Sequence, residues 1–340
     1  MIAVLACALV AHGQSVGDLR AFLQNSAQFT PVEIREVDAG MPVAKILPAP
    51  SPDFIYVLGA TYIRSFPEQY LRLASDMQRL RMLPGYLDAG RFSAMPSLED
   101  LRGFQLEPDD IAELRNCRVG ECEVQLPGEV IDLFRRSVKG KATDANAANA
   151  RAREMALDAV DRYQRGGARE LGSYRDQGKA VSIAEHFANL LQAPGVAPDV
   201  LPELRRYLIG YPQVMLPGAE SFFFWERVDF GLKPTLRINH AVTYRTKGSG
   251  TELAAFAVKQ LYASHYFQAA LDLSICIRDA RLPANQPGFY LVSLKGSRQS
   301  GLTGFRGSIL RRIITSKTRT AQVGVLSILQ STLEAGSRSR

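Results

Sequence analysis

Two histidines, His240 and His265, are the side chains of this sequence best suited to acid–base chemistry. Residues 236–244 are apolar at every second position and His240 shares that parity, while His265 shares the parity of a similar run over 267–277. A period of two is typical of a β-strand. We therefore expect both imidazoles to face the core side of one sheet. There they could orient a ligand or exchange protons near neutral pH.

Four more residues join the histidines in a predicted ligand pocket. The run 222–225 is aromatic, and Glu226 shares parity with Phe224. If that parity faces inward, the carboxylate of Glu226 requires a His or Arg partner. We predict no cofactor and no metal here, because a metal site needs a third ligand that the sequence does not show. The predicted pocket residues are Phe224, Glu226, His240, Tyr244, His265 and Phe267.

The excess charge of the chain lies in its last segment. The net charge is +7, and residues 298–340 contain eight basic residues and one acidic residue, so the preceding part is neutral on balance. Arg298, Arg306 and Arg311 surround glycines at the start of a predicted helix, where cations and free backbone amides suit an anionic headgroup or phosphate. We expect an anionic membrane surface as a partner; the alternative is a solvated helix face. Nucleic acid is not expected, because aromatic residues are not interleaved with these cations.

Cys117 and Cys122 flank a short loop and are predicted to form a local disulfide in an oxidising compartment. A thioredoxin-type redox pair needs a different spacing, and a zinc site needs a second Cys/His pair nearby. Residues 1–13 resemble a secretory signal without its basic start, so we expect a periplasmic or secreted protein. The apolar run in that segment is too short to span a bilayer.

Periodicity and capping residues place the elements that must position these side chains. Pro and Gly residues separate a mostly helical region, residues 127–212, from strand-rich regions on both sides. A capping box of Ser65 and Glu68 is expected to begin the first helix after a strand. The predicted strands are 53–63, 86–93, 101–107, 221–229, 234–245, 253–263, 265–278 and 288–295. One predicted helix begins at Pro108, and the others span 128–138, 144–165, 182–192, 201–209 and 303–335.

The order of elements resembles the START-like, or helix-grip, superfamily. The run Gly288-Phe-Tyr-Leu-Val-Ser-Leu-Lys, followed by a glycine-interrupted helix start, looks like the last strand and helix of such domains. The resemblance covers residues 45–105 and 213–335. It implies an α+β fold in which a curved antiparallel sheet grips a long C-terminal helix and encloses an apolar cavity, and it carries over no catalytic residue.

The predicted organisation is a signal segment at 1–13, a START-like domain formed by 45–126 and 213–335, a helical insertion at 127–212 and a disordered basic tail at 336–340. We expect this protein to bind a hydrophobic or amphipathic, lipid-like molecule between the sheet and the C-terminal helix. Two alternatives remain open. One is an enzyme that uses His240 and His265 as acid and base. The other is an interaction module that docks a partner through an exposed apolar patch on its helical insertion.

Overall fold

The chain folds around one eight-stranded antiparallel sheet, which confirms the predicted α+β class. The computed structural model describes residues 16–25, 27–114, 116–138, 145–176, 178–191, 201–246, 253–279 and 281–338. The strand order is β1-β2-β10-β9-β8-β7-β6-β3. The strands of this sheet are β1 Val43–Ile46, β2 Phe54–Ile63, β3 Tyr86–Arg91, β6 Ala219–Val228, β7 Thr235–Arg245, β8 Leu253–Ala263, β9 Phe267–Arg278 and β10 Phe289–Gln299.

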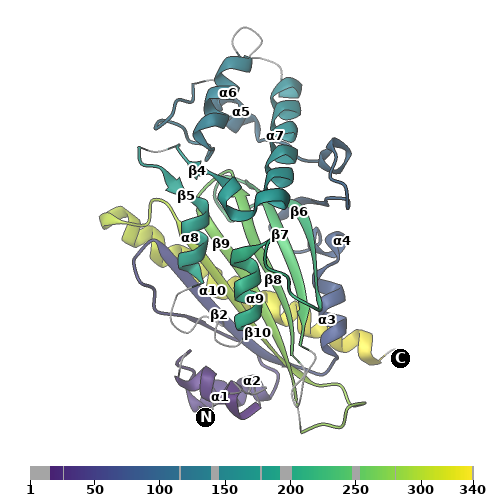
Figure 1. Ribbon diagram of the computed structural model, residues 1–340. Helices are drawn as coiled ribbons and strands as arrows, with labels where there is room; N and C mark the ends of the chain where they lie inside the picture. The colour runs from purple at the N-terminus through teal and green to yellow at the C-terminus, as the bar shows by residue number, and fades with distance from the viewer. Residues whose placement is uncertain are drawn as a thin grey trace, which may run out of the picture.

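Helices cover both faces of this sheet and one of its ends (Figure 1). They are α1 Val16–Asn25, α2 Pro31–Asp38, α3 Pro67–Ala74, α4 Met77–Leu80, α5 Pro108–Leu114, α6 Gly128–Val138, α7 Ala145–Gly166, α8 Ile183–Leu190, α9 Pro202–Gly210 and α10 Gly304–Arg338. Two 3₁₀ turns, η1 Leu98–Leu101 and η2 Gly167–Leu171, and a small hairpin of β4 Ser173–Tyr174 and β5 Val181–Ser182 complete the described elements.

The long helix α10 crosses the sheet on the face opposite to α8 and α9 (Figure 1). Its Leu326 and Leu333 are buried against β2 and β10. The approach is close: a Cβ added to Gly59 of β2 would lie 2.7 Å from Leu326 Cδ1, so a larger residue there would force the Leu326 side chain to shift. The sheet therefore holds a C-terminal helix, as the sequence predicted.

On the sheet face opposite to α10, the helical region packs against the sheet and forms an apolar core. The residues Ala152, Ala156, Val160 and Tyr163 recur along α7 at helical spacing and are all buried. They form one apolar cluster with residues such as Ile238 and Leu261 of the sheet. The helices predicted between 127 and 212 therefore exist, and they cover a sheet face that would otherwise meet water.

Several predicted elements differ from the structure. No strand forms at 101–107, where η1 and a loop lie instead. The N-cap of α3 is Phe66, which makes no side-chain capping hydrogen bond, and the hydroxyl of Ser65 donates to the side chain of Gln69. Strand β9 begins at Phe267, because Tyr266 adopts a left-handed φ of 61° that interrupts the extended backbone. His265 therefore lies in the turn between β8 and β9, not on a strand. The predicted signal segment, residues 1–13, lies outside the described residues.

Candidate functional site

The structure separates the residues predicted to share one pocket. In the β6–β7 pair, His240 is directly opposite Phe223, so the two share a sheet face. Phe224 must then point to the other face, where it packs against Ala241 and Val258. The expectation of a common pocket is wrong for this reason: Phe224 and Glu226 face the α10 side, whereas His240 and Tyr244 face the helical region.

Glu226 has the partner that its burial requires. Its Oε1 lies 3.1 Å from Nη1 of Arg237 and accepts a hydrogen bond of 3.0 Å from Nδ2 of Asn239. All three side chains are buried between the sheet and its covering elements. Burial raises the pKa of Glu226, and the adjacent guanidinium opposes that shift. The group is a compact ion pair inside the fold.

His240 is fully buried among aromatic rings. Its Nδ1 lies 3.2 Å from the hydroxyl of Tyr163, and its ring stacks on Phe223 with centroids 4.7 Å apart. Burial, reinforced by the positive charge of Lys259, lowers the pKa of His240 to about 3. The imidazole is therefore neutral at physiological pH and does not act as a proton shuttle in that range.

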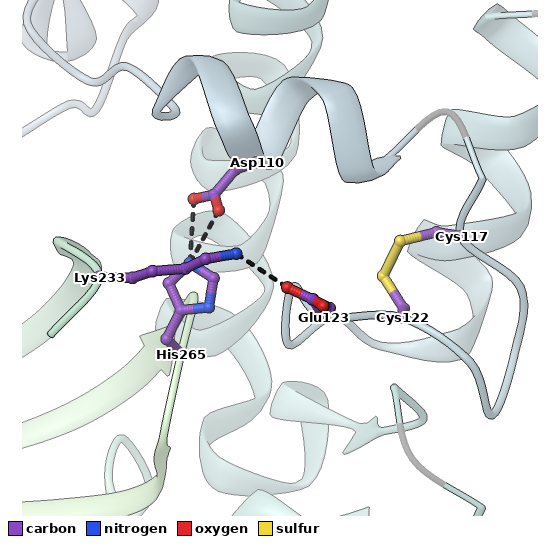
Figure 2. Close-up of a disulfide and its surroundings, with 6 residues drawn as sticks. All are labelled: Asp110, Cys117, Cys122, Glu123, Lys233 and His265. Atoms are coloured by element: carbon purple, nitrogen blue, oxygen red, sulfur yellow. Dashed lines mark hydrogen bonds and ion pairs between the residues drawn. A yellow bond between two sulfur atoms is a disulfide. The ribbon is translucent and has the colours of Figure 1, made fainter.

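His265 belongs to a different contact, at the end of the sheet (Figure 2). Its Nε2 lies 3.0 Å from each carboxylate oxygen of Asp110 on α5, and both side chains are buried. Beside this pair, the Lys233 ammonium lies 2.8 Å from the Glu123 carboxylate. The two pairs attach the α5 segment to the turns at the end of the sheet.

The two imidazoles therefore do not converge. His240 contacts Tyr163 and other rings of the helical region, whereas His265 contacts Asp110. Acid–base catalysis by a histidine pair needs both rings within reach of one reacting atom. The geometry gives that mechanism no common site.

Lys259 is a buried lysine that the sequence analysis did not single out. Its ammonium donates a 2.9 Å hydrogen bond to the carbonyl of Leu208, and it lies 4.4 Å from the ring centroid of Phe187 and 5.2 Å from that of Tyr163. Burial lowers the pKa of Lys259 to about 7. The signal was available in the sequence, because Lys259 shares the parity of apolar residues in a predicted strand.

An apolar cavity lies between the helical region and the sheet. Its volume is about 340 Å³, and it is bounded by α6 and α7 on one side and by β7 and β8 on the other. Its inner wall includes the apolar side chains of Phe134, Ala156, Val160, Ile238 and Leu261. The cavity thus lies on the face of the sheet opposite to α10, not between the sheet and α10.

Charged side chains line the same cavity among its apolar walls. Arg162 of α7 lies 3.2 Å from the Glu129 carboxylate of α6 and 3.0 Å from that of Asp158 on its own helix. Glu170 is a third lining carboxylate. Three carboxylates and one guanidinium give the lining a net negative charge, which disfavours an anionic ligand group.

Tyr262 of β8 is a lining residue of the cavity that carries a hydroxyl. It lines the cavity beside Leu261, and burial raises its pKa well above the ordinary value. Its hydroxyl makes no hydrogen bond to the rest of the described chain. It is therefore free to donate to a ligand oxygen or nitrogen.

Two of the three arginines predicted to bind an anion already have partners within the chain. Arg298 Nε lies 2.5 Å from the Asp53 carboxylate and also contacts His186. Arg311 donates to the carbonyls of Pro52 and Phe54 at 3.0 and 3.4 Å. These contacts hold the end of β10 and the first turns of α10 against the start of β2. Of the three, Arg306 is exposed on α10.

Cys117 and Cys122 form a disulfide with Cα atoms 4.6 Å apart, next to the Lys233–Glu123 pair (Figure 2). Among the described residues, no group of three or more His, Cys, Asp or Glu side chains is arranged to hold a metal ion. No helix of the described part of the chain is long and apolar enough to cross a membrane.

Comparison with known proteins gives no relative: no protein-family model, no curated protein and no solved structure matches this chain.

Proposed function

We propose that this protein binds a hydrophobic or amphipathic small molecule in the cavity beneath α6 and α7. The observation that carries the proposal is an apolar cavity of about 340 Å³, bounded by the sheet on one side and two helices on the other. Pockets for small molecules generally have about 300–1,000 Å³ and mostly apolar walls with few polar groups. This cavity meets both conditions.

The polar groups of the cavity favour a neutral or cationic head on the ligand. The Tyr262 hydroxyl is available as a donor, and three carboxylates line the cavity with one arginine. An alkyl chain would displace poorly held water from the apolar wall. A carboxylate head would meet net negative charge.

A neutral apolar dye, N-phenyl-1-naphthylamine, tests binding directly, because its fluorescence rises when it leaves water. Ala156→Trp places an indole in the cavity, and we expect it to weaken dye binding by about tenfold or more through loss of space. The matched control is Ala150→Trp, on the exposed side of the same helix. It is expected to bind the dye as the wild type does.

The smaller substitution Ala159→Phe repeats the test at another lining position. Circular dichroism and the unfolding midpoint identify variants that remain folded. The proposal is overturned if both variants remain folded and bind the dye as tightly as the wild type, because the dye would then bind outside the cavity. A wild type that binds no dye and no long-chain alcohol would overturn it as well.

We infer in addition that the protein works in an oxidising compartment, such as the periplasm or the extracellular space. The Cys117–Cys122 disulfide supports this inference, because disulfides persist mainly outside the reducing cytosol. Mass spectrometry after thiol labelling of protein recovered from its host tests it. Labelled Cys117 and Cys122 would contradict the inference.

A further inference from the structure

The first half of α10 presents an apolar stripe to solvent. Phe305, Ile309 and Ile313 are 83, 50 and 48% exposed. They are spaced four residues apart, so they lie along one side of the helix. The opposite side carries Leu310 and Ile314, which pack against Ile55, Val57 and Leu302. The exposed stripe is therefore not the side that holds the helix to the sheet.

Exposed cations flank this stripe on both sides. At about 100° per residue, Arg306 and Lys317 fall on one side of it and Arg312 and Arg319 on the other. All four are exposed, and within the described part of the chain none forms an ion pair with a carboxylate. The sequence contains no Asp or Glu between Gly304 and Leu333. The surface is thus apolar at its centre and positive at both borders.

The loop between β6 and β7 adds two apolar side chains next to the helix. Gly231 lies against Lys317, since a Cβ at Gly231 would be 3.3 Å from the lysine Nζ. Phe230 and Leu232, its neighbours, are 39 and 48% exposed. The one acid in this loop, Asp229, accepts a hydrogen bond from the Gly231 amide. Two segments distant in sequence therefore contribute to one surface.

This surface, which we call the α10 patch, lies on the face of the sheet opposite to the ligand cavity. Figure 1 shows the first turns of α10 extending past the edge of the sheet, on the face opposite to α8 and α9. Because the cavity lies on the other face, occupancy of the patch leaves α6 and α7 open to solvent.

We propose that the α10 patch docks on an anionic lipid surface. Phe305, Ile309 and Ile313 would enter the region between headgroups and acyl chains, and the flanking arginines and lysine would contact lipid phosphates. An apolar stripe bordered by basic residues is the arrangement of helices that lie flat in a membrane interface. A second copy of the chain fits poorly, because two patches face to face would bring their cations together.

Vesicle co-sedimentation of the whole protein tests the proposal, with phosphatidylcholine vesicles that contain or lack phosphatidylglycerol. We expect binding only with the anionic lipid, and weaker binding at high salt. The double variant Phe305→Ser/Ile309→Ser removes the apolar contact, and Arg306→Gln/Arg312→Gln removes two charges. Each is expected to reduce binding by about tenfold or more.

Matched controls use exposed residues elsewhere. Met82→Ser/Met95→Ser removes two exposed apolar side chains, and Arg118→Gln/Lys179→Gln removes two exposed cations; both are expected to bind as the wild type does. Equal sedimentation with neutral and anionic vesicles, or unchanged binding by both α10 variants, overturns the proposal. So does a lipid-free dimer in sedimentation velocity that the Phe305→Ser/Ile309→Ser variant abolishes, since the patch would then be a protein interface.

Discussion

At the scale of single residues, burial decides what the basic side chains can do. His240 and Lys259 lie on neighbouring strands, directly opposite each other, and both are fully buried. Their ordinary pKa values would allow them to carry charge in solution, but burial lowers both values. Both side chains therefore tend toward their neutral forms within the fold.

The variant Lys259→Met should stabilise the protein most at neutral and acidic pH. Because burial lowers the Lys259 pKa from 10.5 to about 7, the unfolded chain binds more protons than the folded chain between these values. The free energy of unfolding of the wild type therefore rises with pH between these two pKa values of Lys259. We expect the variant to gain roughly 2–4 kcal/mol near pH 6 and to lose this advantage by about pH 10.

Urea unfolding of both proteins across this pH range measures the difference. Lys179→Met, at an exposed lysine, is the control and should show no such pH dependence. A stability offset between Lys259→Met and the wild type that is constant with pH would contradict the predicted protonation behaviour.

At the scale of elements, contacts between distant segments determine which side chains meet. The period-two pattern predicted the strands of the C-terminal half to within a few residues, because alternation reports directly on sheet faces. It could not report the register that places Phe223, rather than Phe224, beside His240. Nor could it show that helices cover both faces and so bury polar residues such as Arg237 and Asn239.

The cavity illustrates the same limit on prediction. The sequence predicted a cavity on the α10 side, by resemblance to helix-grip proteins, and this resemblance stays a prediction. The small residues Ala152 and Ala156 on α7 were visible as helical positions. Their packing against β7 and β8 depends on a tertiary contact between the helical region and the sheet, which no local pattern encodes.

The His265–Asp110 pair should hold α5 to the end of the sheet. Asp110→Asn removes the charge of a buried partner without changing its size, and we expect a loss of about 1–3 kcal/mol in the free energy of unfolding through the weakened buried hydrogen bond. Chemical denaturation measures this loss. Glu123→Gln, in the exposed ion pair beside it, is the control and should remain close to the wild type. If Asp110→Asn and Glu123→Gln lowered the free energy of unfolding equally, burial would not be what makes the His265–Asp110 pair important for stability.

At the scale of the whole molecule, the sheet separates two surfaces with different properties. One face, with α6 and α7, contains an apolar cavity lined in part by acids, and the other carries α10 with its basic patch. Ligand binding and lipid contact are therefore proposed for opposite faces. This arrangement would allow the cavity to remain accessible while the protein rests on a lipid surface.

The charge on the cavity lining predicts an order of ligand affinity. Dodecanol and dodecylamine should displace N-phenyl-1-naphthylamine at lower concentration than dodecanoate, because Glu129, Asp158 and Glu170 oppose a carboxylate. We expect a difference of about tenfold at low salt that shrinks at high salt. Tightest binding by dodecanoate would contradict this account of the cavity lining.

The most direct test of the central claim follows the methyl group of Met155 by NMR. The chain has seven methionines, and among those described Met155 is the one that lines the cavity. With ¹³C-labelled methionine methyl groups, assigned by Met155→Leu, titration with dodecanol should shift the Met155 resonance and leave those of the exposed Met82 and Met95 in place. A Met155 resonance that does not move at saturating dodecanol would contradict ligand binding in this cavity.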